Sequence, residues 1–187
     1  MAVQGVEHIV RCLLIAILLS ASVPALPQPA LLPPGLTGAD AIRLRTLEPL
    51  VWSDPWSARE RLRSLPPLAA DVEAARYLLL AQALLYLYRD EEFAAAVDAG
   101  LAALGADSSP ILRYQLAVLD GIRIARDGGF IDAATRLADS AEEARAEGLA
   151  AIALFATAEL AYTHAHAGDY ERALVVLQDA AREALLA

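Results

Sequence analysis

The sequence predicts an all-α protein built as an α-solenoid, and three observations support this prediction. Hydrophobic residues make up 57% of the chain but aromatic residues only 6%, so that Ala and Leu, which are good helix formers, dominate. Short polar turns separate stretches in which apolar residues recur with the helical period. One short phrase also returns at a nearly constant distance, which is typical of repeats that bury their apolar faces against their neighbours.

The repeated phrase is a polar turn followed by an aromatic residue, with an alanine three places later. It is plainest at residues 168–174, which read Gly-Asp-Tyr-Glu-Arg-Ala-Leu. If Pro55, Phe93, Phe130 and Tyr170 are taken as equivalent, the steps between them are 38, 37 and 40 residues. The sequence therefore predicts about four helical hairpins of nearly equal length.

Residues 1–25 are predicted to be a secretory signal peptide. Arg11 precedes an uninterrupted apolar run at residues 12–19, and small residues lead to a suitable cleavage site after Ala25. The run is shorter than the roughly 20 apolar residues that cross a bilayer. An uncleaved signal anchor is the alternative interpretation. Both place the rest of the chain across the inner membrane, in a bacterial periplasm.

Residues 26–38 are predicted to be a proline-rich linker, because their prolines and glycines can sustain neither a helix nor a central strand. From Ala39 the pattern is helical. A domain of helical repeats is predicted for residues 39–187. Its four units are expected at about residues 39–67, 69–107, 109–147 and 148–187.

The first unit is the least regular. Its apolar stripe is expected to consist of Ile42, Leu44, Leu47 and Leu50. Pro49 is expected to disturb the last turn of its first helix. Ser53-Asp54-Pro55 then reads as a helix start, with an acceptor side chain at the cap and proline at the first helical position. Pro66-Pro67 is expected to end this second helix.

The remaining units read as three pairs of helices joined by polar turns. Residues 71–88 form the longest periodic stretch, in which Leu78 and Leu84 are among the residues expected to face neighbouring helices. Charged or glycine-rich turns then divide the rest of the chain. The helices predicted after this stretch cover residues 93–104, 111–126, 130–147, 148–167 and 170–186.

These units resemble the tetratricopeptide repeat (TPR). In the last unit the large and small pair Leu160-Ala161 is followed, at the spacings of that family, by Gly168, Tyr170, Ala173, Leu177 and Ala180. The resemblance implies a right-handed α-solenoid of about four helix–turn–helix units. In it the aromatic fills the wedge between units and the alanine lets two helices approach closely.

A signal peptide followed by slightly long helical repeats is also similar to the periplasmic sensory regions of bacterial diguanylate cyclases and sensor histidine kinases. That resemblance implies a membrane span and a catalytic domain further along the chain. The alternative function is therefore the ligand-sensing region of a truncated signalling enzyme.

The predicted binding groove follows from the ends of the first helices in each unit. Arg89, Arg126 and His166 are expected to form a basic column, which could hold the carboxylate of a peptide or an anionic metabolite. The helix dipole alone also favours basic residues at these helix ends. The remaining groove residues are predicted to be Tyr88, Gln115, Ile122 and Tyr162.

The sequence predicts no catalytic residue, cofactor or metal site. Phosphate loops, dinucleotide fingerprints, paired-cysteine sites and nucleophile elbows do not occur in it. The one cysteine, Cys12, lies within the apolar run of the leader, which excludes a disulfide scaffold. His164 and His166 point about 200° apart on a helix and cannot share a metal on one face.

The predicted partner is a protein or peptide, bound without covalent change. The formal charge of −9 argues against nucleic acid and anionic membranes, both of which need basic surface. Contact with a membrane is expected only through the leader or a missing downstream span. A homodimer is also compatible with the sequence. A structural spacer in an envelope assembly is a third hypothesis, and the reading frame beyond codon 187 discriminates the sensory region from the other two.

Overall fold

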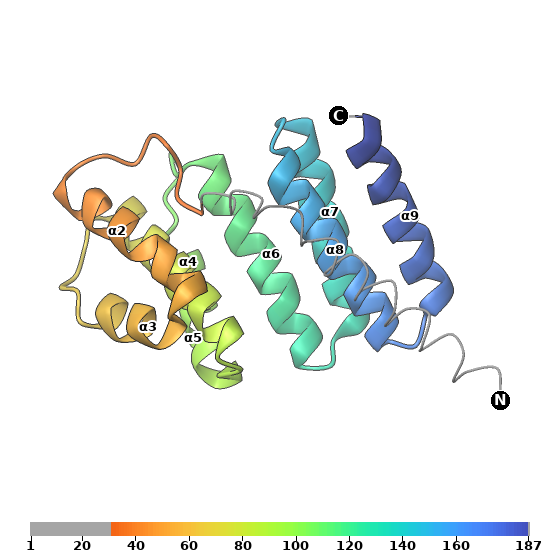
Figure 1. The fold of residues 1–187 in the computed structure, drawn as a ribbon, viewed down its shortest axis with the longest axis horizontal. Helices are drawn as coiled ribbons and strands as arrows, with labels where there is room; N and C mark the ends of the chain where they lie inside the picture. The colour runs from red at the N-terminus through yellow and green to blue at the C-terminus, as the bar shows by residue number, and fades with distance from the viewer. Residues whose placement is uncertain (1–30, 187) are drawn as a thin grey trace.

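The computed structural model describes residues 31–186, with side chains up to Arg182, and all regular elements in this range are α-helices (Figure 1). The prediction of an all-α protein is confirmed for these residues, whereas the predicted signal peptide lies outside them. No helix in the described range is both long enough and apolar enough to cross a membrane. The helices are α2 (Ala39–Ser53), α3 (Pro55–Arg63), α4 (Ala70–Tyr86), α5 (Asp90–Ala103), α6 (Pro110–Arg126), α7 (Phe130–Ala146), α8 (Ala150–His166) and α9 (Tyr170–Leu186).

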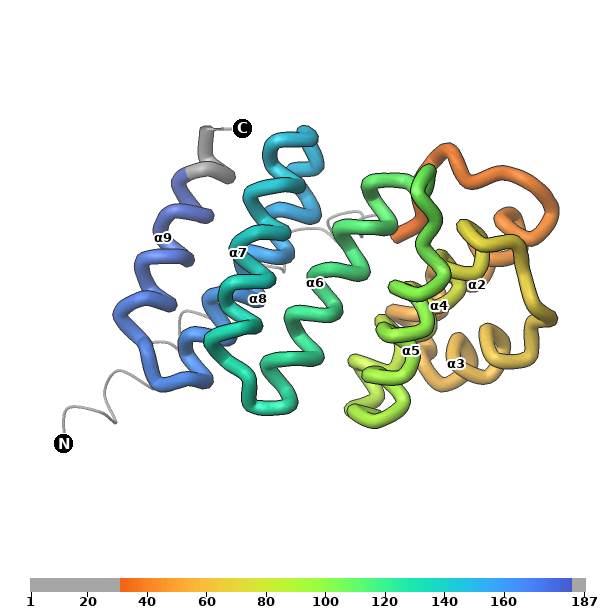
Figure 2. Tube along the Cα trace, turned by 180° about the vertical axis from the view of Figure 1, so that it is seen from behind, coloured from red at the N-terminus to blue at the C-terminus, as the bar shows by residue number. Residues whose placement is uncertain are grey.

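Consecutive helices pack as four hairpins, α2–α3, α4–α5, α6–α7 and α8–α9, which follow one another along the long axis of the molecule (Figures 1 and 2). Cα atoms of the first helices, α2, α4, α6 and α8, approach those of the next first helix within 8 Å. In the part of the chain described, consecutive second helices do not approach each other in this way. The first helices therefore form a gathered row on one side of the molecule.

The hairpins from α4 onward repeat every 40 residues. The first helices begin at Ala70, Pro110 and Ala150, and the second helices begin at Asp90, Phe130 and Tyr170. The register predicted for the second unit is wrong by three residues, because Phe93 lies in the fourth position of its helix. Phe93 therefore corresponds to Ala133 and Ala173, and all three side chains are buried.

The turn inside each regular hairpin needs one residue with positive φ. Gly128 and Gly168 adopt φ of 86° and 84°, values that glycine reaches without a steric penalty. Tyr88 occupies the same place between α4 and α5 and adopts φ of 54°. Because it projects from this turn, the Tyr88 side chain is 81% exposed.

Helix α2 differs in part from its predicted stripe. Leu44 and Leu47 are buried as expected, but Ile42 is 65% exposed and Val51 completes the buried face instead. Pro49 lies inside the helix, which continues to Ser53. The predicted start of α3 is confirmed, since Pro55 is its first residue and the Asp54 carboxylate accepts a hydrogen bond from the Ser57 N–H at 3.1 Å.

Residues 31–38, the end of the predicted linker, pack against α2. Leu31 and Leu32 are buried, and the Glu48 carboxylate accepts hydrogen bonds from both of their backbone N–H groups. The Arg45 guanidinium donates to the carbonyl oxygens of Pro33, Pro34 and Leu36 at 2.6, 3.2 and 3.3 Å. These bonds fix the chain at the point where it enters the helical part.

Helices α6 and α7 approach closely at Gly121. A β-carbon added there would lie 2.7 Å from Cγ of Leu137, a side chain that is fully buried. The absence of a side chain at Gly121 thus makes room for Leu137 to fill the interface, as interiors packed to crystal-like density require.

Candidate ligand-binding site

A cavity of about 560 Å³ lies along the row of first helices, and each of the four contributes to its wall. Its volume falls within the range typical of small-ligand sites, about 300–1,000 Å³. None of the described residues that line it is charged. They are Leu31, Trp52 of α2, Leu78, Gln82 and Tyr86 of α4, Ile111 and Gln115 of α6, and Gly148, Leu149, Ala150, Ala151, Ile152 and Phe155 at the start of α8.

Helical spacing explains how these side chains reach one place. Leu78, Gln82 and Tyr86 are four residues apart, and so lie on one face of α4. Ile111 and Gln115 of α6 have the same spacing. The 40-residue repeat places Phe155 of α8 at the position equivalent to Gln115, so neighbouring helices present corresponding faces to the cavity.

Two glutamine side chains supply the polar groups inside this wall. Gln115 is only 8% exposed, its Oε1 is buried, and its amide makes no hydrogen bond with any of residues 31–186. Gln82 is 3% exposed, and its Nε2 donates to the Tyr86 hydroxyl at 3.5 Å, at the long limit of a hydrogen bond. Leaving a buried amide unpaired is unfavourable by about 1–3 kcal/mol. A ligand that forms hydrogen bonds with the Gln115 amide would remove this penalty.

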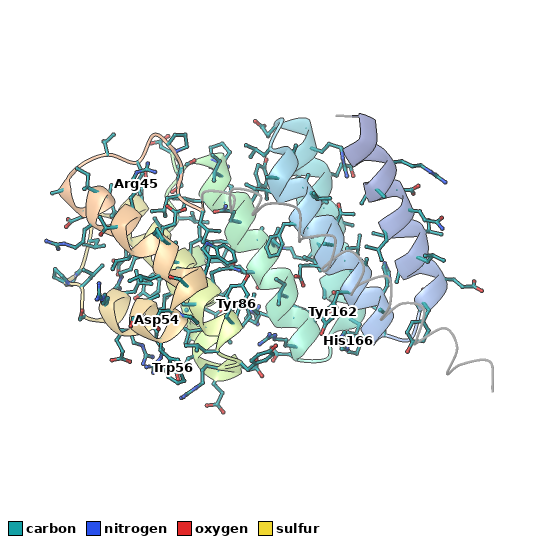
Figure 3. All side chains as sticks on the ribbon, in the orientation of Figure 1. Arg45, Asp54, Trp56, Tyr86, Tyr162 and His166 are labelled. Atoms are coloured by element: carbon teal, nitrogen blue, oxygen red, sulfur yellow. The ribbon has the colours of Figure 1, made fainter. Side chains whose placement is uncertain are left out.

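Aromatic side chains close one side of the cavity. The rings of Trp52 and Tyr86 meet edge to face, with centroids 5.3 Å apart and an interplanar angle of 61°. In Figure 3, Tyr86 lies near the middle of the row of first helices. Burial raises the pKa of the Tyr86 hydroxyl, the hydrogen bond from Gln82 lowers it, and the charge of Glu159 raises it. Tyr86 therefore stays neutral and able to donate a hydrogen bond at ordinary pH.

Charged residues lie beyond the cavity, toward the C-terminal ends of α6 and α8. Burial raises the pKa of Glu159 to about 7, and the charge of Arg126 opposes this shift. The Arg126 guanidinium forms an ion pair with Asp90 and lies 5.5 Å from the centroid of the Phe93 ring. Within the described range, Glu159 itself has no ion-pair or hydrogen-bond partner for its carboxylate.

The structure brings only some of the predicted groove residues together: the Arg126 guanidinium lies 6.0 Å from the centroid of the Tyr88 ring, but the seven residues do not line one site. Gln115 lines the cavity, and the other six do not. Tyr88 projects from a turn, Ile122 is buried, and the Arg89 guanidinium pairs with Glu92 at 2.5 Å. The rings of Tyr162 and His166 contact each other on α8, with centroids 4.2 Å apart (Figure 3). The basic column stays a prediction, and in the structure two of its members, Arg89 and Arg126, each pair with a carboxylate.

Sequence reasoning missed Gln82, Tyr86 and Trp52. With the 40-residue repeat, Tyr86 and not Arg89 is equivalent to Arg126 and His166. The register error therefore selected residues three places too late in the chain. A search for a constant spacing between helix starts, and not between aromatic residues, would have identified Gln82 and Tyr86. No repeat could have identified Trp52, because the first hairpin does not share the period.

In the described part of the chain, no three His, Cys, Asp or Glu side chains lie close enough together to hold a metal ion. Comparison of the chain with protein-family models, with curated proteins and with solved structures finds no match. The function is therefore inferred from the cavity and its chemistry.

Proposed function

We propose that this chain is an exported, TPR-like binding module that binds a protein or peptide partner through the row of first helices and does not change it covalently. The observation that carries the proposal is the uncharged cavity, whose wall contains the unpaired amide of Gln115. A preformed cavity binds with little ordering cost. The proposed export rests on the sequence of residues 1–25.

The right-handed α-solenoid belongs to the same proposal. The 40-residue repeat from α4 to α9 and the contacts between consecutive first helices support it. In such an arrangement each hairpin buries its apolar side against its neighbours. The row of first helices then offers a continuous surface to a partner.

The sensory region of a signalling enzyme is a second candidate. It is favoured by one observation, namely that all four hairpins contribute to one cavity of small-ligand size. A ligand there would contact every first helix at once, and could bias how the hairpins sit relative to one another. Such a bias is what a sensor must pass on.

Occupancy of the cavity can be tested with N-phenyl-1-naphthylamine, a neutral apolar dye that fluoresces when shielded from water. The purified chain is expected to bind the dye saturably. Ala151→Phe fills the cavity and should weaken dye binding about tenfold or more, since a filled site excludes the ligand. Ala158→Phe is the matched control, because Ala158 is exposed on the same helix but does not line the cavity. Absent saturation, or equal loss in both variants, would contradict the proposal.

A further inference from the structure

We infer that the cavity selects an uncharged, apolar ligand through a primary carboxamide or an extended peptide residue that pairs with the side-chain amide of Gln115. This inference rests on the proposed function and adds the class of ligand. It replaces recognition by charge with recognition by paired hydrogen bonds.

The absence of charge in the wall decides the charge of the ligand. The cavity is lined by apolar side chains, two glutamines and one tyrosine. Moving a carboxylate or an ammonium group from water into such surroundings is costly unless an opposite charge pairs with it. No lining residue in the described part of the chain offers that charge, so a neutral ligand is favoured.

The unpaired amide decides the polar group of the ligand. A glutamine side chain presents an N–H donor and a carbonyl acceptor side by side. Neither group of Gln115 makes a hydrogen bond with the described residues. A primary carboxamide, or the N–H and C=O of one residue in an extended peptide, presents the complementary donor and acceptor side by side. A trans secondary amide points the two in opposite directions, and an ester supplies only an acceptor.

The rest of the wall decides the body of the ligand. Trp52, Leu78, Ile111 and Phe155 surround the cavity with apolar surface. Burying an alkyl chain or leucine-like side chains against them is favourable in proportion to the area removed from water. Gln82, whose one hydrogen bond in the described range is the long contact to Tyr86, provides a second amide for a ligand that extends toward α4.

Displacement of the bound dye by matched compounds tests the inference. Decanamide carries the primary amide, methyl nonanoate is an ester of the same size, and decanoate and decylammonium carry charges on chains of similar length. The amide is expected to bind about tenfold more tightly than the ester, as two hydrogen bonds replace one. Both charged compounds should bind more weakly still. Comparing the affinity of the capped dipeptide N-acetyl-Leu-Leu-N-methylamide with that of decanamide distinguishes a peptide source from a small-molecule source.

Gln115→Leu provides the decisive variant. It is expected to bring the amide and the ester to similar affinities, while ester binding stays within about twofold of the original chain. Gln178→Leu, which alters an exposed glutamine on α9, should keep the tenfold preference. Since Gln115→Leu removes a buried group without a partner, the melting temperature should not fall, and loss of binding cannot be mistaken for unfolding.

Two failures are distinguishable. If the dye and all the compounds fail to bind, the proposed function is wrong. If the dye binds but a charged compound displaces it better than the amide, or if the amide preference survives in Gln115→Leu, the inference falls and the binding function stands.

Discussion

The first hairpin, α2–α3, and the three regular hairpins, α4–α9, share one apolar core but differ in the further contacts that position them. Polar side chains hold the first hairpin in place: Arg45 and Glu48 bind the preceding backbone, and Arg59 joins α3 to Glu92 of α5 at 2.8 Å. Small residues determine the regular hairpins, where the space left by Gly121 is filled by Leu137. The cavity lies where the two regions meet, since Leu31 and Trp52 line it together with residues of α4, α6 and α8.

Two carboxylates of the regular hairpins, one at the contact with the first hairpin and one beside the cavity, also differ in their surroundings. Glu92 of α5 contacts α3 and is surrounded by three guanidinium groups. The hydrogen bond from Arg59 lowers the pKa of Glu92, although partial burial opposes this shift. Glu159 of α8 has no such partner in the described range, and burial raises its pKa. The difference teaches that paired charges hold the contact between α3 and α5, whereas the carboxylate beside the cavity is unpaired in the described range.

The largest expected effect on stability comes from a substitution that disrupts the packing of the regular hairpins. Leu137→Ala should lower the free energy of unfolding by about 3 kcal/mol, because it removes a fully buried side chain and leaves a cavity. Ile131→Ala on the same helix is the control. It should change stability by less than about 0.5 kcal/mol, since Ile131 is 84% exposed. Urea unfolding of the three chains provides the comparison.

Gly121→Ala tests the same interface, because its effect on the free energy of unfolding should change sign when Leu137 is replaced by alanine. In the original chain the added methyl group meets Leu137 and should cost about 1–2 kcal/mol. In the Leu137→Ala background that contact is gone, and the higher helix propensity of alanine should stabilise the protein by up to about 1 kcal/mol. Equal effects in the two backgrounds would show that Leu137 does not depend on Gly121.

The next effect concerns the unpaired carboxylate. Because the pKa of Glu159 in the folded state is about 7, above its ordinary value of 4.5, the folded state binds the proton more tightly than the unfolded state does. Stability must therefore fall as pH rises from about 4.5 to 7. At about 1.4 kcal/mol per pKa unit the shift sets an upper bound of about 3 kcal/mol.

Glu159→Gln should remove this dependence. It is expected to raise the free energy of unfolding by about 2 kcal/mol at pH 8 and to leave it nearly unchanged at pH 4. Glu143→Gln, at an exposed site on α7, should not alter the difference between the two pH values. If urea unfolding shows the same pH dependence in Glu159→Gln as in the original chain, another group is responsible.

How far the sequence predicts the structure also differs between the two regions. The helices of the regular hairpins begin and end within about three residues of their predicted bounds, because their polar turns and apolar periods are local signals. The alignment of the repeats with one another is harder to predict, because aromatic residues can occupy different positions in successive helices. Phe93 is the fourth residue of α5, whereas Phe130 is the first residue of α7. Of the cavity, only Gln115 was selected from the sequence.

The rest of the cavity depends on contacts that no local pattern encodes. Leu31 belongs to a segment predicted to be a linker, and it reaches the wall only because Glu48 holds its backbone 17 residues along the chain. Trp52 lies in α2, whose apolar stripe is irregular. Long-range polar contacts of this kind decide the position of the first hairpin, and periodicity says nothing about them.

The smallest expected effect tests this contribution directly. Arg45→Met keeps the aliphatic stem but removes the guanidinium that binds three carbonyl oxygens of residues 33–36, and should cost about 1–2 kcal/mol. Because Leu31 would then be held less firmly, dye binding in the cavity should also weaken a fewfold. Arg43→Met is the control, since among residues 31–186 the Arg43 side chain makes only an exposed ion pair with Asp40, at 3.5 Å. If the two variants lose stability and dye affinity equally, residues 31–38 do not help to form the cavity, and the first hairpin contributes to it through α2 alone.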